Sequence, residues 1–86
     1  EGLWRLPLEA KYKKMLKAEW ADIKNVGGRE AGSITAALFL SEFVDGPTWA
    51  HFDIAGPTFV SSKTDHFRKG ATGAMVRTVL SWLESK

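Results

Sequence analysis

The stretch WAHFDIAGPTF, residues 49–59, decides the predicted fold of this chain. Residues 49–55 predict a β-strand, because side chains on a strand alternate between two faces and this segment alternates in that way. Large apolar residues fall on both faces, which is typical of a short strand buried between two layers. Gly56 and Pro57 then end the strand. We therefore expect an α/β fold in which this strand lies inside a sheet.

Two segments before the strand predict helices. Residues 6–18 place Pro7 at a first helical position, where no amide donor is needed, and their apolar side chains recur at helical spacing. Residues 33–44 are apolar around nearly the whole circumference, which predicts a buried helix. Ser33 is the expected N-cap of this second helix, although a start at Gly32 or earlier fits as well.

A third helix is expected after the strand, over residues 72–86, with Thr72 as its N-cap. Its apolar face is formed by Met75, Val76, Val79, Leu80 and Leu83. Residues 21–32 and 56–70 predict loops, the first with glycines that need positive φ. One strand cannot make a sheet. The parallel neighbours are therefore expected outside these residues, which makes the chain a helix-helix-strand-helix segment, residues 1–86, of a larger domain.

Composition excludes several classes of protein. The 86 residues carry 12 basic and 10 acidic side chains, a balance that does not favour nucleic acid or an anionic membrane as partner. The chain has no cysteine, which rules out disulfides and thiolate metal sites and fits a reducing compartment. No apolar run is long enough to span a bilayer. Four Trp and five Phe are a large apolar load for one small domain. They predict either a dense core or faces made for neighbours.

His51 and Asp53 share one face of the predicted strand and are the first candidates for chemistry. Two such side chains do not hold a metal ion, and no further ligands stand at helpful spacing. No nucleophile elbow of the Gly-x-Ser-x-Gly type accompanies them. A structural role through hydrogen bonds is the favoured interpretation. The lysines of residues 11–17 are interpreted as the solvated face of the first helix.

Residues 55–58 are the best candidate for a binding site. They follow the carboxyl end of the predicted strand, which is where α/β sheets place their ligands. Ala55, Gly56 and the Thr58 hydroxyl could line a pocket there. A tight turn without a binding role explains the same residues equally well.

Four blocks of the sequence together resemble the leucine aminopeptidase (cytosol aminopeptidase) family in its C-terminal part. They are WRLPL at 4–8, ADIKNVGGREAGSITAALFLSEFV at 21–44, WAHFDIAGPTF at 49–59 and KGATGAMVRTVLSWL at 69–83. The blocks cover nearly the whole chain, in order and with the expected separations. Several long blocks in sequence are far more specific than any single short motif.

The resemblance implies a cytoplasmic metalloaminopeptidase that removes N-terminal amino acids from peptides. It implies two divalent metal ions, Zn or Mn, a catalytic domain built on a mixed sheet, and a homo-hexamer made of two trimers. The family's metal ligands include acidic residues of the signature NTDAEGRL, which is absent here, so no catalytic residue and no metal ligand carries over.

Three positions carry over as substrate contacts. The resemblance places Ala55 and Thr58 in the pocket for the first side chain of the substrate, and Val26 on the leaving side. Family members differ at the position of Thr58. His51 and Asp53 match positions that are not ligands. Two alternatives remain open: a stand-alone interaction module, and a DNA-binding domain derived from the same sequence family.

Overall fold

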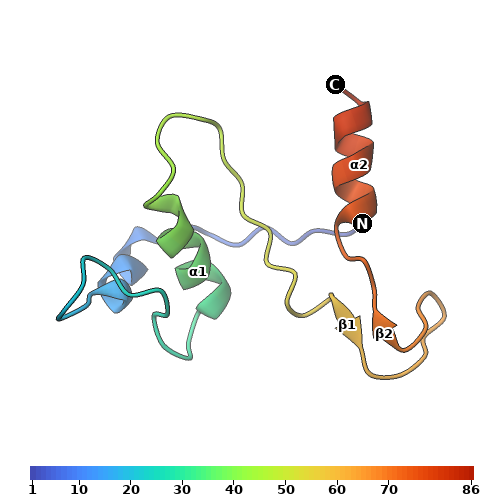
Figure 1. Cartoon of the computed structure of the whole chain (residues 1–86), viewed down its shortest axis with the longest axis horizontal. Coiled ribbons are helices and arrows are strands. Elements are labelled where there is room, and N and C mark those ends of the chain that lie inside the picture. The colour runs from blue at the N-terminus through green and yellow to red at the C-terminus, as the bar shows by residue number, and fades with distance from the viewer. The chain divides into compact units, whose positions relative to one another are not determined.

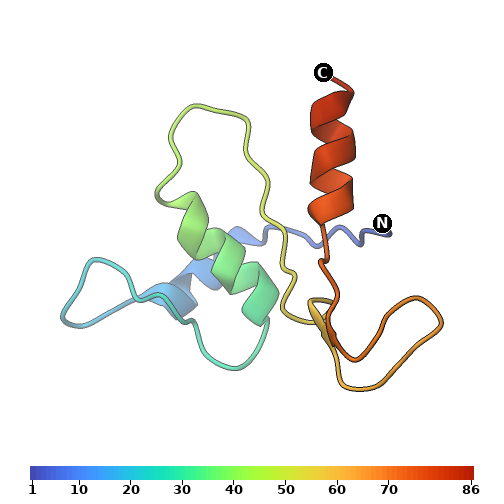
Figure 2. The same ribbon diagram turned by 45° about the vertical axis from the view of Figure 1, so that its right-hand side comes forward.

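The computed structural model describes residues 1–86 as two compact units (Figures 1 and 2). The helical unit comprises Trp4–His51. The hairpin unit comprises Glu1–Leu3 together with Phe52–Lys86. Along the chain the elements are η1 (Ala10–Leu16), α1 (Gly32–Ser41), β1 (Phe59–Val60), β2 (Gly70–Ala71) and α2 (Val76–Glu84). Each unit is described by itself.

The first helix, η1, is a 3-10 helix that starts later than its sequence predicted. Glu9 has extended φ and ψ of −73° and 104°, and its carboxylate accepts a hydrogen bond of 3.1 Å from the Lys11 amide. This cap begins the helix at Ala10, so Pro7 lies before the helix and not in its first turn. The predicted position of Pro7 is therefore wrong. The helix ends at Lys17, which is again extended.

Helix α1 confirms the second predicted helix and the alternative start at Gly32. Ala31 precedes it with a left-handed φ of 52°, so Ser33 is not the N-cap. The expectation that the helix is buried on all sides is only partly met. Thr35, Ala37 and Leu38 are buried, whereas Leu40 and the following Phe43 are exposed.

The core of the helical unit lies where η1 packs against α1, and the two helices run side by side in both views (Figures 1 and 2). Its fully buried side chains are Leu16 from η1 and Leu38 from α1. Lys13 of η1 forms an ion pair of 2.5 Å with Glu42 at the end of α1. The lysines of residues 11–17 are all exposed, as their pattern predicts.

The loop between the two helices approaches α1 closely at Gly27. A Cβ atom on this residue would lie 3.1 Å from both Cβ and Cγ2 of the buried Thr35. The next residue, Gly28, has a φ of +119°, which confirms the prediction that this loop needs a left-handed glycine. Both glycines therefore have a structural reason, and neither one needs a phosphate ligand.

The predicted strand over residues 49–55 is not formed. Those residues have no regular structure, and the sheet is instead an antiparallel hairpin in which Phe59 pairs with Ala71 and Val60 with Gly70. Both strands fall in the region assigned to a long loop, apart from Ala71. The physical reason is that a strand exists only by hydrogen bonding to a neighbour, and residues 49–55 find none within this chain. Parallel neighbours, and hence a mixed sheet, remain an expectation.

Helix α2 begins after Met75, so Thr72 is not its N-cap. The cap comes from the other end of the chain. The Glu1 carboxylate accepts hydrogen bonds from the Met75 amide (3.1 Å), from the Thr78 amide (3.3 Å) and from the Thr78 hydroxyl (2.6 Å). A carboxylate at a helix N-terminus satisfies free amides and complements the helix dipole. None of the residues of the hairpin unit is fully buried.

Candidate functional site

The best-defined candidate site is the turn of residues 55–58, which carries two of the three predicted substrate contacts. Asp53 opens it, because its carboxylate accepts a hydrogen bond of 3.2 Å from the Ala55 amide. The Thr58 amide then donates to the Ile54 carbonyl oxygen at 3.0 Å. Asp53 thus holds the backbone through a hydrogen bond, which is the kind of role predicted for it, although in a turn and not on a strand.

Thr72 joins this turn to the hairpin. Its hydroxyl donates to the Pro57 carbonyl oxygen at 2.5 Å, and its amide donates to the Thr58 carbonyl oxygen at 3.0 Å. The same hydroxyl accepts from the Ala74 amide at 3.3 Å. Thr72 was expected to cap α2, and its sequence position gave no signal of this role. The turn is therefore held at both ends while the Ala55 and Thr58 side chains remain exposed.

Val26, the third predicted contact, lies in the loop of the helical unit beside Gly27. Its side chain is 65% exposed. The structure thus places Ala55 and Thr58 in one turn of the hairpin unit and Val26 in the other unit. All three are accessible to a ligand, and no hydrogen bond between side chains occupies any of them.

His51 lies at the end of the helical unit, where its ring stacks on Trp49 with centroids 6.3 Å apart. No nucleophile or second histidine accompanies it, and no group of three or more His, Cys, Asp or Glu side chains in the chain could hold a metal ion. No helix is both long enough and apolar enough to cross a membrane. The described residues therefore offer binding surfaces and no catalytic constellation.

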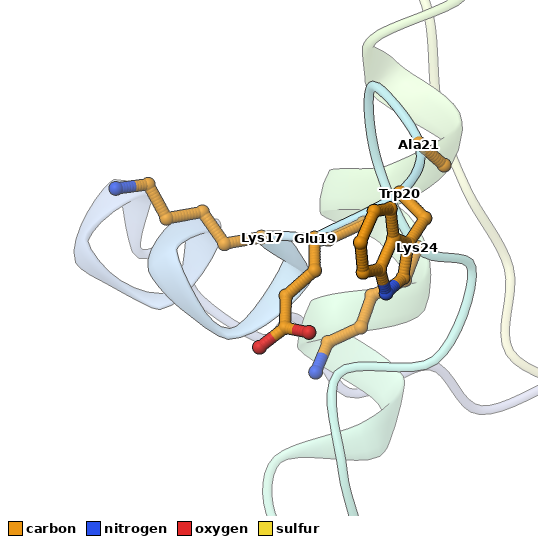
Figure 3. A pocket seen from close by; sticks show the side chains of 6 residues that line it. Lys17, Glu19, Trp20, Ala21 and Lys24 are labelled. Carbon is orange, nitrogen blue, oxygen red and sulfur yellow. The ribbon is translucent and has the colours of Figure 1, made fainter.

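A second candidate is an open hollow of about 450 Å³ in the helical unit (Figure 3). It is lined by Lys17, Ala18, Glu19, Trp20, Ala21 and Lys24. The Trp20 side chain is 96% exposed, and Lys17 points away from the other labelled side chains. No buried polar group is aimed into the hollow, so it lacks the convergent donors and acceptors that fix a small ligand. The sequence analysis named none of its residues as a site.

Comparison with known proteins identifies the class. Residues 1–80 match the family model described as the cytosol aminopeptidase family, catalytic domain. The chain belongs to this family, as its sequence blocks indicated.

Relatives from cyanobacteria are similar to nearly all of the chain. A probable cytosol aminopeptidase of Picosynechococcus sp. is 54% identical over 85 residues, which cover 99% of this chain and 17% of the relative. A probable cytosol aminopeptidase of Trichodesmium erythraeum is 53% identical over the same shares. That of Synechococcus elongatus is 56% identical over 86 residues, covering 99% and 18%. The chain thus spans about a sixth of the length of these curated relatives.

Proposed function

We propose that the chain is part of a metal-dependent leucyl aminopeptidase, in which it supplies scaffold and a wall of the substrate pocket. The observation that carries the proposal is the match of residues 1–80 to the catalytic domain of the family. The names of the relatives describe cytosol aminopeptidases, which hydrolyse the N-terminal residue from a peptide. We place the protein in the cytoplasm by the same reasoning.

In this proposal the turn of residues 55–58 faces the first side chain of the peptide. Ala55 is small and leaves room for that side chain, while Thr58 supplies a methyl group and a hydroxyl. The hydrogen bonds from Thr72 and to Asp53 support this role, because a pocket wall discriminates between substrates only when its backbone is held in place. Val26 contacts the leaving side of the substrate.

Two divalent ions, Zn or Mn, would supply an activated water and polarise the scissile carbonyl in the complete enzyme. The residues of this chain do not fit such a centre, since they form no group that could hold even one ion. The ligands are therefore assigned to the remainder of the catalytic domain. What the present residues contribute is binding and orientation of the peptide, by packing and by exclusion of water.

The proposed partners are peptide substrates, the remainder of the catalytic domain and the other subunits of a homo-hexamer. The distribution of apolar side chains supports a neighbour. Only Leu16, Ala37 and Leu38 form the buried apolar core, whereas three of the four tryptophans, Trp4, Trp20 and Trp82, are exposed. A protein that functions alone rarely exposes so much large apolar surface. We assign neither membrane nor nucleic acid as partner, because the charge is balanced and no helix could span a bilayer.

A segment exchange tests the function. The chimaera is the Synechococcus elongatus relative in which the homologous segment is replaced by residues 1–86. We expect it to release leucine from a leucyl amide in a metal-dependent way, as the unmodified relative serves to calibrate, whereas the purified 86-residue chain releases none. A folded chimaera without activity, beside an active relative, would overturn the proposal. Metal-dependent hydrolysis by the purified chain, with host enzyme excluded, would overturn it as well.

A further inference from the structure

Helix α2 carries an apolar face that packs against no other helix or strand of its unit. Val76, Val79, Leu80 and Leu83 recur at the spacing of one helix face, and their exposures range from 41% to 65%. Arg77, Ser81 and Glu84 occupy the opposite side. A helix with this division of side chains is stable when its apolar side is covered.

The orientation of this helix is set at its first turn. Glu1 caps the Met75 and Thr78 amides, and the helix thereafter receives no side-chain hydrogen bond from any other element (Figure 1). At the far end Lys86 lies over the Trp82 ring, 4.9 Å from its centroid, away from the apolar face. The face formed by Val76, Val79, Leu80 and Leu83 is thus continuous and free of charge.

Two observations indicate what covers the face. The match to the catalytic-domain model runs through residue 80 and so includes the first half of α2, which makes the helix part of that domain. The relatives are several times longer than this chain, so about five-sixths of their polypeptide is available to supply a complementary surface. A polar or charged partner does not fit, because the face offers it neither hydrogen bonds nor countercharge.

We propose that the α2 face docks in cis against an apolar surface of the remaining catalytic-domain polypeptide. The proposal rests on the proposed function and adds to it the surface through which this segment joins the enzyme. Docking also explains the cap, since Glu1 fixes the start of α2 and thereby the direction in which its apolar face points.

Cysteine accessibility in the chimaera tests the docking, because the present chain contains no cysteine. Leu83→Cys and Val79→Cys probe the face, and Glu84→Cys on the polar side is the matched control. Labelling of the α2 peptide by a maleimide is followed by mass spectrometry, in native chimaera and after unfolding in urea. We expect the two face positions to react at least about tenfold more slowly in the native protein, and Glu84→Cys to change by less than about twofold.

Equal labelling of face and control positions in a folded chimaera would overturn the docking, even if the chimaera is an active aminopeptidase. Protection that disappears on dilution would assign the face to a second copy and would overturn it too. If the cysteine variants do not fold, hydroxyl-radical footprinting of the unsubstituted chimaera replaces them. Docking then requires protection of Leu80 and Leu83 relative to Trp82. An inactive chimaera with a protected face would sink the proposed function and leave the docking intact.

Discussion

The Thr72 hydroxyl donates a hydrogen bond of 2.5 Å to the Pro57 carbonyl oxygen, fifteen residues earlier in the chain. Together with the bond from the Thr72 amide to the Thr58 carbonyl oxygen, it attaches the turn of residues 55–58 to the end of β2. The position of the proposed pocket wall therefore depends on a residue that does not itself face the pocket.

Replacement of this hydroxyl should loosen the turn. Thr72→Ala removes one donor and leaves the Pro57 carbonyl to water, a loss of about 1 kcal/mol for a typical hydrogen bond. We expect the Thr58 amide to exchange with deuterium several-fold faster, as measured by NMR of the 86-residue chain. Thr72→Ser keeps the hydroxyl and should restore slow exchange. Equal rates in all three proteins would show that the bond does not hold the turn.

Gly27 has no room for a side chain. Gly27→Ala would bring a methyl group to 3.1 Å from Thr35, which is buried on α1 and cannot yield easily. We expect a loss of about 1–3 kcal/mol in the free energy of unfolding, typical of overpacking. Gly32→Ala is the control, because nothing lies within 4 Å of a Cβ there and alanine favours the helix. Urea denaturation compares the two, and equal stabilities would contradict the close approach.

The Glu1 cap predicts an acid-sensitive first turn of α2. Hydrogen bonds from the Thr78 hydroxyl and the Met75 amide lower the pKa of the Glu1 carboxyl. A lowered pKa in the folded state means that the ionised form stabilises the fold. This contribution is complete above the ordinary glutamate pKa of about 4.3 and is lost as the pH falls through the lowered value.

Glu1→Gln should therefore speed amide exchange at Met75 and Thr78 at neutral pH and should remove the acid dependence of that exchange after correction for intrinsic rates. Glu84→Gln, at the other end of the same helix, should leave both unchanged. An unaltered pH profile in Glu1→Gln would mean that the carboxylate does not cap α2 in solution.

His51 is predicted to support structure and not to take part in the reaction. Its ring contacts Trp49, and no catalytic partner lies beside it. His51→Asn in the chimaera should lower thermal stability more than it lowers kcat per folded enzyme. A loss of kcat of about a thousandfold with folding intact would contradict this role, since it equals about 4 kcal/mol of transition-state stabilisation.

The sequence predicts α1 and α2 correctly because helical periodicity is a local signal. The side chains that make α1 buried at Leu38 and α2 apolar at Val79 recur every three to four residues. Their starts are less well predicted. Ser33 and Thr72 are common capping residues, yet α1 follows Ala31 and α2 is capped by Glu1, which no local pattern could indicate.

The strand prediction failed for a different reason. Alternation over residues 49–55 describes a segment that suits a sheet, but pairing depends on a neighbour that local sequence does not specify. The hairpin of β1 and β2 has only two residues in each strand, too few to show alternation. Val26, Ala55 and Thr58 became candidates chiefly through resemblance to a family, and the structure adds that Ala55 and Thr58 share one constrained turn.

Substitution of Ala55 tests the pocket wall most directly. Ala55→Leu in the chimaera adds three carbon atoms to the proposed pocket, where each methylene changes discrimination by about 1–3 kcal/mol. We predict that the ratio of kcat/KM for leucyl over alanyl substrates falls at least about tenfold, with metal content unchanged because no ligand is touched. An unchanged ratio in a correctly assembled variant would contradict the claim that this chain forms the wall of the substrate pocket.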